Sequence, residues 1–213
     1  MITLINGSER NEFSFIVNEM HKIRAQVFRD RLMWDVSVEN GLERDEFDDE
    51  NPLYLISVDE NSGIVQGSLR LLPTTGPNML RDVFPILLED GNVVESANIW
   101  EVSRFAIAQH AELPSAGRKL SYVTGELLAG IVEVGLTSGL SEVVAVFDSR
   151  MIRILRSGGY PPEIIGGPKK IGVCMTYAGL FEISEEKLKD IREACGIKHS
   201  VLDPQSTKRL FAA

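Results

Sequence analysis

The decapeptide NIWEVSRFAI at residues 98–107 constrains the fold most strongly, because it has the composition of a buried strand and yet carries two full charges. Its apolar members are aromatic or aliphatic types that favour strands. Glu101 and Arg104 stand three residues apart among them. Side chains of a regular strand alternate between faces, so these two charges should point to opposite sides of a sheet. A buried charge costs several kcal/mol unless it is paired, so each of them needs a partner.

The rest of the composition is that of an ordinary globular domain. The chain has 213 residues, of which 44% are hydrophobic, and we expect one domain over 1–213 with a proper core. No run of eighteen apolar residues predicts a membrane span, and the first residues lack the features of a secretory signal. The net charge of −9 argues against general nucleic-acid binding. Two cysteines without metal or redox spacing suggest the cytoplasm, and three scattered histidines argue against a metal site or a Ser-His-Asp triad.

Periodicity and turn residues predict an α/β sandwich around one mixed sheet. The predicted strands occupy 2–5, 53–59, 64–73, 99–107 and 141–148, with two more within 163–167 and 171–183. The predicted helices occupy 10–30, a short stretch around 78–84, 117–138, 149–159 and 184–196, the last with Ser184 as N-cap. Residues 31–52 show no convincing period and are predicted to be a long excursion of the kind that is usually functional or mobile.

Further charges stand beside apolar residues elsewhere in the chain. Arg24 shares a helical face with Phe28, Asp45 and Asp48 flank an aromatic residue, and Arg70 lies among leucines. Taken singly, these charges have ordinary explanations: an arginine reaching to solvent along a helix edge, a solvated acidic loop, and a cap on a sheet edge.

With Glu101 and Arg104, the sequence places three arginines and three carboxylates at positions that are apolar or partly buried by pattern. The simplest explanation is one shared cluster, since arginine binds carboxylates bidentately. Such a cluster can be purely structural. It can also hold a zwitterionic ligand, with arginine on the carboxylate and aspartate on the ammonium, and the spacing alone does not choose between the two.

The order and spacing of these residues resemble those of the acyl-homoserine lactone synthases, the autoinducer synthases of bacterial quorum sensing. The resemblance runs from residue 1 to beyond 180 and rests on "RAQVFRDRLMWD", "DEFD" and "WEVSRFAI". It implies a GNAT-like three-layer sandwich around a mixed, bulged, V-splayed sheet. It further implies an acyltransferase that joins S-adenosylmethionine to an acyl chain carried as a thioester on acyl carrier protein, and that then releases the lactone and methylthioadenosine. No metal or prosthetic group is implied.

The resemblance also assigns roles to individual residues. Those implied to bind S-adenosylmethionine are Arg24, Phe28, Trp34, Asp45, Asp48, Arg70, Phe84 and Phe105. Those implied at the reacting centre are Glu101, as the base for the attacking amine, with Ser103 and Arg104. Those implied to shape an acyl pocket between the 99–107 and 141–148 strands are Trp100, Ala145, Phe147 and Met151.

Two finer expectations concern the acyl donor. Synthases that prefer 3-oxo chains often have threonine or serine where this chain has Ala145, so we expect an unsubstituted or 3-hydroxy acyl chain. A set of basic side chains could dock the acidic carrier protein, and a merely solvated helix face explains them equally well. That set is Arg118, Lys119, Arg150, Arg153 and Arg156.

Three alternatives stay open at this point. A synthase that uses acyl-CoA directly would have the same residues. A GNAT N-acyltransferase using acetyl-CoA would be expected to carry a Q/R-x-x-G-x-G/A loop before its long helix, and "ELPSAGRKLS" lacks that spacing. A sensing or interaction module without enzymatic activity would explain the charges as structural.

If Glu101 and Arg104 serve one active site, the strand that carries them cannot be regular. We therefore predict a β-bulge between Trp100 and Arg104, which would insert one residue, turn both charges toward one cleft and splay the sheet there.

Overall fold

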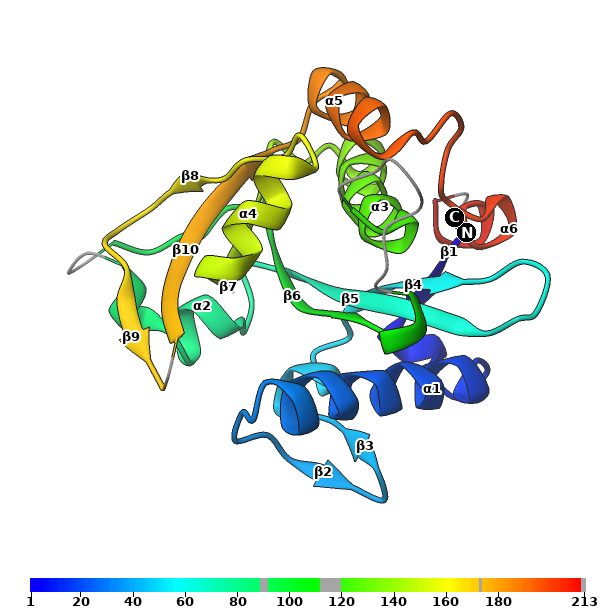
Figure 1. The fold of residues 1–213 in the computed structure, drawn as a ribbon, viewed down its shortest axis with the longest axis horizontal. Helices are drawn as coiled ribbons and strands as arrows, with labels where there is room; N and C mark the ends of the chain where they lie inside the picture. The colour runs from blue at the N-terminus through cyan, green and yellow to red at the C-terminus, as the bar shows by residue number, and fades with distance from the viewer. Residues whose placement is uncertain (89–91, 112–119, 173, 212–213) are drawn as a thin grey trace.

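One mixed β-sheet organises the chain, as a computed structural model shows for residues 1–88, 92–111, 120–172 and 174–211 (Figure 1). Its strands follow the order β1-β4-β5-β6-β7-β10-β8, and β9 pairs with β10. The strands are β1 Ile2–Asn6, β4 Leu53–Val58, β5 Val65–Pro73, β6 Ile99–Ile107, β7 Glu142–Asp148, β8 Glu163–Ile164, β9 Lys169–Ile171 and β10 Cys174–Glu182. All of these pairings are antiparallel except β6 with β7.

Helices cover both faces of the sheet, which makes the three layers expected from the family resemblance (Figure 1). The helices are α1 Ser14–Ala25, α2 Met79–Asp82, α3 Tyr122–Ser138, α4 Ser149–Ser157, α5 Glu185–Cys195 and α6 Pro204–Phe211. Helices α3, α4 and α5 pack on one face in the main hydrophobic cluster. On the opposite face, α1 packs against the β1–β6 half of the sheet, and α2 with the turn after it packs against β7 and β10.

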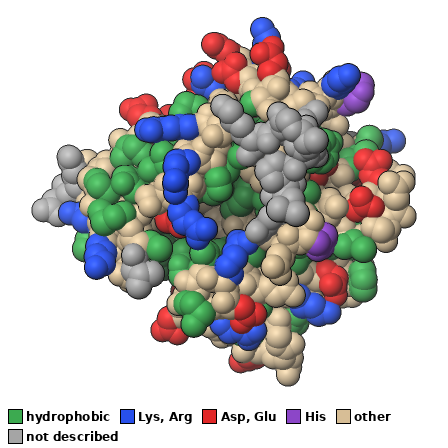
Figure 2. All heavy atoms as spheres, in the orientation of Figure 1, with side chains coloured by type: hydrophobic (Ala, Val, Ile, Leu, Met, Phe, Trp, Pro, Cys, Tyr) green, Lys and Arg blue, Asp and Glu red, His purple; other side chains and the backbone are tan. Residues whose placement is uncertain are grey.

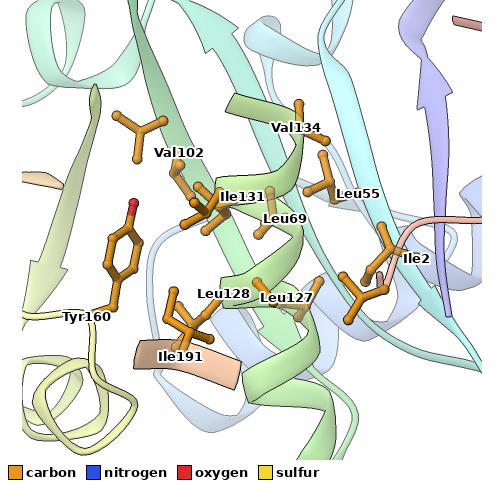
Figure 3. Close-up of a cluster of buried hydrophobic side chains, with 14 of the residues drawn as sticks. Ile2, Leu55, Leu69, Val102, Leu127, Leu128, Ile131, Val134, Tyr160 and Ile191 are labelled. Carbon is orange, nitrogen blue, oxygen red and sulfur yellow. The ribbon is translucent and has the colours of Figure 1, made fainter. Parts of the chain in front are cut away.

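The main core forms where α3 crosses the sheet. Figure 3 shows Leu127, Leu128, Ile131 and Val134 of α3 facing aliphatic side chains from the strands. Tyr160 and Ile191 lie on the side of α3 away from Ile2 and Leu55. Ser121 begins this helix as N-cap, and Gly139 ends it with the positive φ that favours glycine. Because α3 is apolar on nearly every side, it is buried between the sheet and α5.

Several boundaries differ from the predictions. The first helix begins at Ser14, and after Ala25 it widens into a π turn over Gln26–Arg31. The long helix begins at Tyr122, and residues 117–119 of the predicted helix lie outside the described part of the chain. The sequence analysis did not predict α6, a short amphipathic helix at the C-terminal end of the described chain.

The segment 31–52 is more ordered than the absence of a period suggested. It contains a small hairpin of β2 Val38–Glu39 and β3 Leu42–Glu43, followed by a 3-10 turn over Glu46–Asp49. Asn40 and Gly41 join the hairpin strands with φ of +52° and +81°. An Asn-Gly pair with two positive φ values is the turn that tight hairpins favour.

The sheet opens between β6 and β7. The two strands pair only from Ile99 opposite Glu142 to Val102 opposite Ala145. Beyond this point β6 continues along β5, and β7 continues along β10. The expected V-shaped splay therefore begins at Val102 and Ala145.

The predicted β-bulge is present, but its predicted position was wrong. The pairing of β5 with β6 is regular from Trp100 to Ser103, and the extra residue lies between Ser103 and Ala106. Arg104 itself takes the irregular conformation, with φ of +54°. The bulge comes later than predicted because register with β5 is kept throughout the stretch that also pairs with β7.

None of the described helices is both long and apolar enough to cross a membrane.

Candidate active site

A cluster of buried arginines and carboxylates lies between α1 and the centre of the sheet. Arg24, in the last turn of α1, is 1% exposed, so it does not reach to solvent along the helix edge. Its Nε donates to Glu43 Oε2 at 2.5 Å, and its two terminal nitrogens donate to the carboxylate of Asp48 at 2.8 and 2.9 Å. All three guanidinium nitrogens of Arg24 are therefore hydrogen-bonded, and they join α1 to the hairpin and to the 3-10 turn that follows it.

Asp48 receives more donors than any other member of the cluster. Besides Arg24, it accepts from the Tyr54 hydroxyl at 2.8 Å, from a terminal nitrogen of Arg70 at 3.0 Å and from the backbone N–H of Asp45 at 3.0 Å. Burial alone would raise the pKa of Asp48, but the two arginines hold that pKa well below its usual range. Asp48 is therefore a permanent anion that joins α1, β4 and β5.

Arg70, from β5, is fully buried and faces the same cluster. Its terminal nitrogens bind Asp45, one of them at 3.1 Å from Oδ2, and its Nε donates to the hydroxyl of Ser103 at 3.1 Å. Its guanidinium also lies 5.5 Å from the centre of the Phe47 ring. Arg70 therefore lies in the interior and does not cap a sheet edge.

Arg104 and Asp45 form the outer rim of the cluster. One terminal nitrogen of Arg104 is 2.6 Å from Asp45 Oδ2, and these two side chains are 8% and 11% exposed. Arg104 Nε also donates to Glu43 Oε1 at 3.1 Å, and its guanidinium lies 5.3 Å from the centre of the Phe28 ring. Burial, together with the nearby Arg24 and Arg70, lowers the pKa of Arg104 in spite of its carboxylate partners. This pair is thus the least buried part of the cluster.

The sequence prediction of the cluster was right about five members and wrong about the sixth. Glu43, which the sequence analysis did not single out, supplies the third carboxylate and is 0% exposed. The signal that could have located it is the Asn40-Gly41 turn, which makes a hairpin and so places Glu43 at a fixed position. Glu101 forms no ion pair with the arginines among the described residues.

Glu101 instead receives the first backbone N–H groups of α2. Its two carboxylate oxygens accept from Leu80 N at 2.6 Å and Met79 N at 3.0 Å, and the side chain is 1% exposed. Burial raises the pKa of Glu101, and the two N–H donors oppose that rise. Arg104 reaches the same place, because one of its nitrogens is 3.3 Å from the Met79 sulfur. The bulge therefore does turn Glu101 and Arg104 toward one region.

Two of the predicted aromatic residues flank this rim, and a third packs against a neighbouring apolar cluster. Trp34 stacks on Phe28 with ring centres 5.3 Å apart and remains 40% exposed. The π turn makes this contact possible, since Trp34 N donates to the carbonyl of Phe28 across six residues. Phe84 is half-buried and packs beside the apolar cluster formed by Phe47, Leu72 and Met79.

The predicted acyl-pocket residues gather on the opposite face of the sheet, beside the splay. Trp100, Ala145, Phe147 and Met151 all belong to or pack against the main cluster below α3 and α4. Phe105, which the resemblance assigned to S-adenosylmethionine binding, packs against the same cluster and so lies on the face of the sheet opposite the arginines and carboxylates. Phe147 stacks on Tyr177, with ring centres 6.3 Å apart and planes 9° apart. The end of the β6–β7 pairing therefore has the charged cluster on one face of the sheet and these apolar side chains on the other.

The basic residues predicted for docking line α4. Arg150, Arg153 and Arg156 are exposed, and Figure 2 shows basic side chains following this helix beside a recess with hydrophobic side chains. Arg118 and Lys119 lie outside the described residues. No group of His, Cys, Asp and Glu within the described ranges is arranged to hold a metal ion.

Comparisons with known proteins point in one direction. A family model described as "Autoinducer synthase" matches residues 6–191. The acyl-homoserine-lactone synthase of Agrobacterium fabrum is 37% identical over 178 residues, which is 84% of each chain. The corresponding synthase of Pseudomonas aeruginosa is 36% identical over 183 residues, covering 85% of this chain and 90% of the relative.

Solved structures agree with the sequence relatives. The AHL synthase LasI aligns with a TM-score of 0.76 at 30% identity, covering 93% of this chain and 98% of its own. A CoA-dependent acyl-homoserine lactone synthase, BjaI, solved with SAM and isopentyl-CoA, aligns with a TM-score of 0.83 over 100% of this chain and 99% of its own. At 23% identity, that second likeness concerns the fold alone.

A pH dependence of stability follows from His21, which is buried on α1 with Nδ1 at 2.7 Å from the Glu43 carbonyl oxygen. Burial, and then Arg24, lowers its pKa from 6.5 to about 4, so the folded state keeps it neutral. The unfolded chain takes up a proton first as the pH falls from 6.5 to 4, and His21 therefore costs up to about 3 kcal/mol of stability across that window. Urea unfolding at pH 7.0, 5.5 and 4.5 should show this loss, and His21→Asn should show much less of it. Equal pH dependence of stability in both proteins would contradict the assignment to His21. Asp48 does not account for a loss in this pH range, because its lowered pKa affects stability only below the ordinary value of 3.8.

Proposed function

This chain belongs to the autoinducer synthase family, and from that premise we propose that it transfers an acyl group from acyl carrier protein to the amine of S-adenosylmethionine and then closes the lactone. The enzyme is an acyltransferase of the acyl-homoserine-lactone synthase type. The observation that carries the proposal is the composition of the buried cluster. Three arginines meet three carboxylates there, and the Arg104–Asp45 pair at its rim is the least buried part of the cluster.

The amino-acid end of S-adenosylmethionine fits this rim by exchange of partners. Its ammonium needs an anion and its carboxylate needs a cation, and the Arg104–Asp45 pair offers one of each. Inserting the zwitterion replaces one ion pair by two, so the cluster remains electrically balanced. The stacked Phe28 and Trp34 lie over the rim, where an aromatic face can meet the adenine or the sulfonium.

Acyl transfer requires a neutral amine, because an ammonium has no lone pair. Glu101 is the candidate base, directly or through a water, and its raised pKa makes it a better proton acceptor than an exposed carboxylate. The amine nitrogen attacks the thioester carbonyl, the carbon–sulfur bond breaks, and the thiol leaves with a proton. Negative charge that develops on the carbonyl oxygen is best met by backbone N–H groups of β6 where the bulge frees them from pairing with β5.

Lactone closure then needs mainly the right conformation. One oxygen of the methionine carboxylate attacks the γ-carbon of the same molecule, and the bond from that carbon to the sulfonium breaks, which releases methylthioadenosine. A guanidinium that holds the carboxylate in one orientation favours the conformer that can react. Arg104 is proposed for this role. Arg70 and Ser103, which are hydrogen-bonded to each other, are proposed to support it from β5 and β6.

The acyl chain is proposed to pass through the splay between β6 and β7. Support comes from the side chains of Trp100, Ala145 and Met151, which offer an apolar environment on the α3 side of that opening. The exposed arginines of α4 border the same region, which supports a carrier protein as donor, since these arginines are not in salt bridges with any described carboxylate. Acyl-CoA is the alternative donor, and the likeness in fold to CoA-dependent synthases keeps it open.

The function is tested by Arg104→Ala and Glu101→Gln. We expect each variant to lower kcat/KM for lactone formation by about a hundredfold or more, because each removes a group that acts on the reacting molecule. Mass spectrometry of the lactone and of methylthioadenosine measures this, and circular dichroism checks the fold. Arg81→Ala, which removes an arginine from α2 outside the cluster, serves as the control and should leave turnover within twofold. Near-normal lactone formation by the Arg104 variant would contradict the proposed site.

The donor is tested by reversing charge on α4. In Arg150→Glu/Arg153→Glu we expect the KM for an acyl carrier protein donor to rise about tenfold and its salt dependence to weaken, since steering by opposite charges is screened by salt. Lys189→Glu on α5 is the matched exposed control. An unchanged KM, or faster turnover of acyl-CoA than of the carrier-bound donor by the wild-type enzyme, would overturn the carrier as donor.

The expected preference for unsubstituted or 3-hydroxy chains is tested by competition between donors. Ala145 offers no hydroxyl to a 3-oxo group, so 3-oxo donors should give the smallest share of product, and Ala145→Thr should raise that share. Mass spectrometry of the lactones from an equimolar mixture measures the shares. A clear 3-oxo preference by the wild-type enzyme would show that the prediction is wrong.

A further inference from the structure

We propose that Glu43 is a positioning residue for this reaction, whose carboxylate holds Arg104 in the bulged conformation in which the guanidinium receives the carboxylate of S-adenosylmethionine. The inference rests on the proposed function, because it takes the rim of the cluster to be the binding site. It goes beyond that function by assigning a role to a residue that lies under the rim and does not itself contact the substrate.

The geometry of Glu43 is that of a bridge between two arginines. Each carboxylate oxygen serves one of them: Oε2 accepts from Arg24 Nε at 2.5 Å, and Oε1 accepts from Arg104 Nε at 3.1 Å. The side chain is 0% exposed, so solvent cannot replace either contact. The buried Arg24 is fixed in turn by two hydrogen bonds to Asp48, and Glu43 therefore ties Arg104 to an anchored group.

Arg104 needs an anionic partner to hold its position, because its backbone conformation is strained and the burial of its charge is unfavourable. A non-glycine residue at φ of +54° is strained by about 1 kcal/mol. Its side chain is long, and burial with two neighbouring arginines disfavours its charge. Its anionic partners among the described residues are Glu43 and Asp45. When the substrate ammonium takes Asp45, Glu43 is the partner that remains.

Glu43 is itself held rigidly. It pairs with Val38 in the small hairpin, whose Asn40-Gly41 turn sets the register. Its carbonyl oxygen accepts a hydrogen bond from His21 on α1. The hairpin is thereby fastened to the helix, so the carboxylate starts from a fixed backbone position and does not have to be ordered when substrate binds.

The test compares binding of S-adenosylmethionine by calorimetry in the wild type and in Glu43→Gln. Glutamine can accept from one arginine only, and its NH₂ group then faces the N–H of the other, so the bridge that links Arg104 to Arg24 is broken in either orientation. We expect Kd for S-adenosylmethionine to rise about tenfold, whereas the KM for the acyl donor stays within twofold. In an Arg104→Ala background, Glu43→Gln should change Kd no further, because the two residues act as one unit.

A matched control separates positioning from general destabilisation. Glu133 on α3 is also a buried carboxylate bound by an arginine, Arg192 at 2.9 Å, and it lies on the other face of the sheet. Glu133→Gln should lower the Tm and leave Kd for S-adenosylmethionine unchanged. If Glu43→Gln unfolds the protein, Glu43→Asp keeps the charge and, being one methylene shorter, reaches one arginine only; it should raise Kd by a smaller factor.

The outcomes distinguish the two proposals. If Arg104→Ala weakens binding and Glu43→Gln or a folded Glu43→Asp does not, the positioning role of Glu43 is wrong and the proposed function stands. If Arg104→Ala also binds S-adenosylmethionine normally, the proposed site itself is wrong. Parallel loss of Kd in the Glu43 and Glu133 variants would show a structural role only.

Discussion

The carboxylate of Asp48 is the interaction on which the rest of this site depends. It receives hydrogen bonds from Arg24 on α1, Tyr54 on β4 and Arg70 on β5, and so it joins the helix layer to the sheet. Burying one such charge alone would cost several kcal/mol. The cluster avoids this cost because the two arginines are themselves paired and the charged groups in it are hydrogen-bonded. The layers at this point cannot shift independently, and the arginines present a fixed geometry toward the rim.

The bulge in β6 places chemistry at that rim. A regular strand would direct Arg104 into the apolar core below α3, whereas the left-handed residue directs it to Glu43 and Asp45. The same strand leaves β7 after Val102, so the charged rim on one face adjoins an apolar opening to the other. A single irregular strand thereby brings together a site for a zwitterion and a path for an acyl chain.

The parts of the fold that follow local periodicity could be predicted from sequence. The hairpin of β4 and β5, the strand β7 and the helix α5 with its Ser184 cap all have strong local signals, and the structure confirms them. The charges among apolar residues also predicted a cluster, because an unpaired buried arginine is too costly. Its membership was harder to predict, since Glu43 stands in an acidic run and only the Asn40-Gly41 turn distinguishes it from its exposed neighbours.

The position of the bulge and the π turn were not available from sequence. A bulge is defined by the register of its partner strand, and nothing in NIWEVSRFAI says that β5 keeps pairing as far as Ser103. The widening of α1 after Ala25, which brings Trp34 onto Phe28, has no signal in the apolar periodicity of the segment. The most direct test of the whole account is the structure of this protein with S-adenosylmethionine bound. The account predicts that the Arg104–Asp45 contact is replaced, with the substrate carboxylate on Arg104, its ammonium on Asp45 and Glu43 still on Arg104. An intact Arg104–Asp45 pair with S-adenosylmethionine bound elsewhere would contradict it.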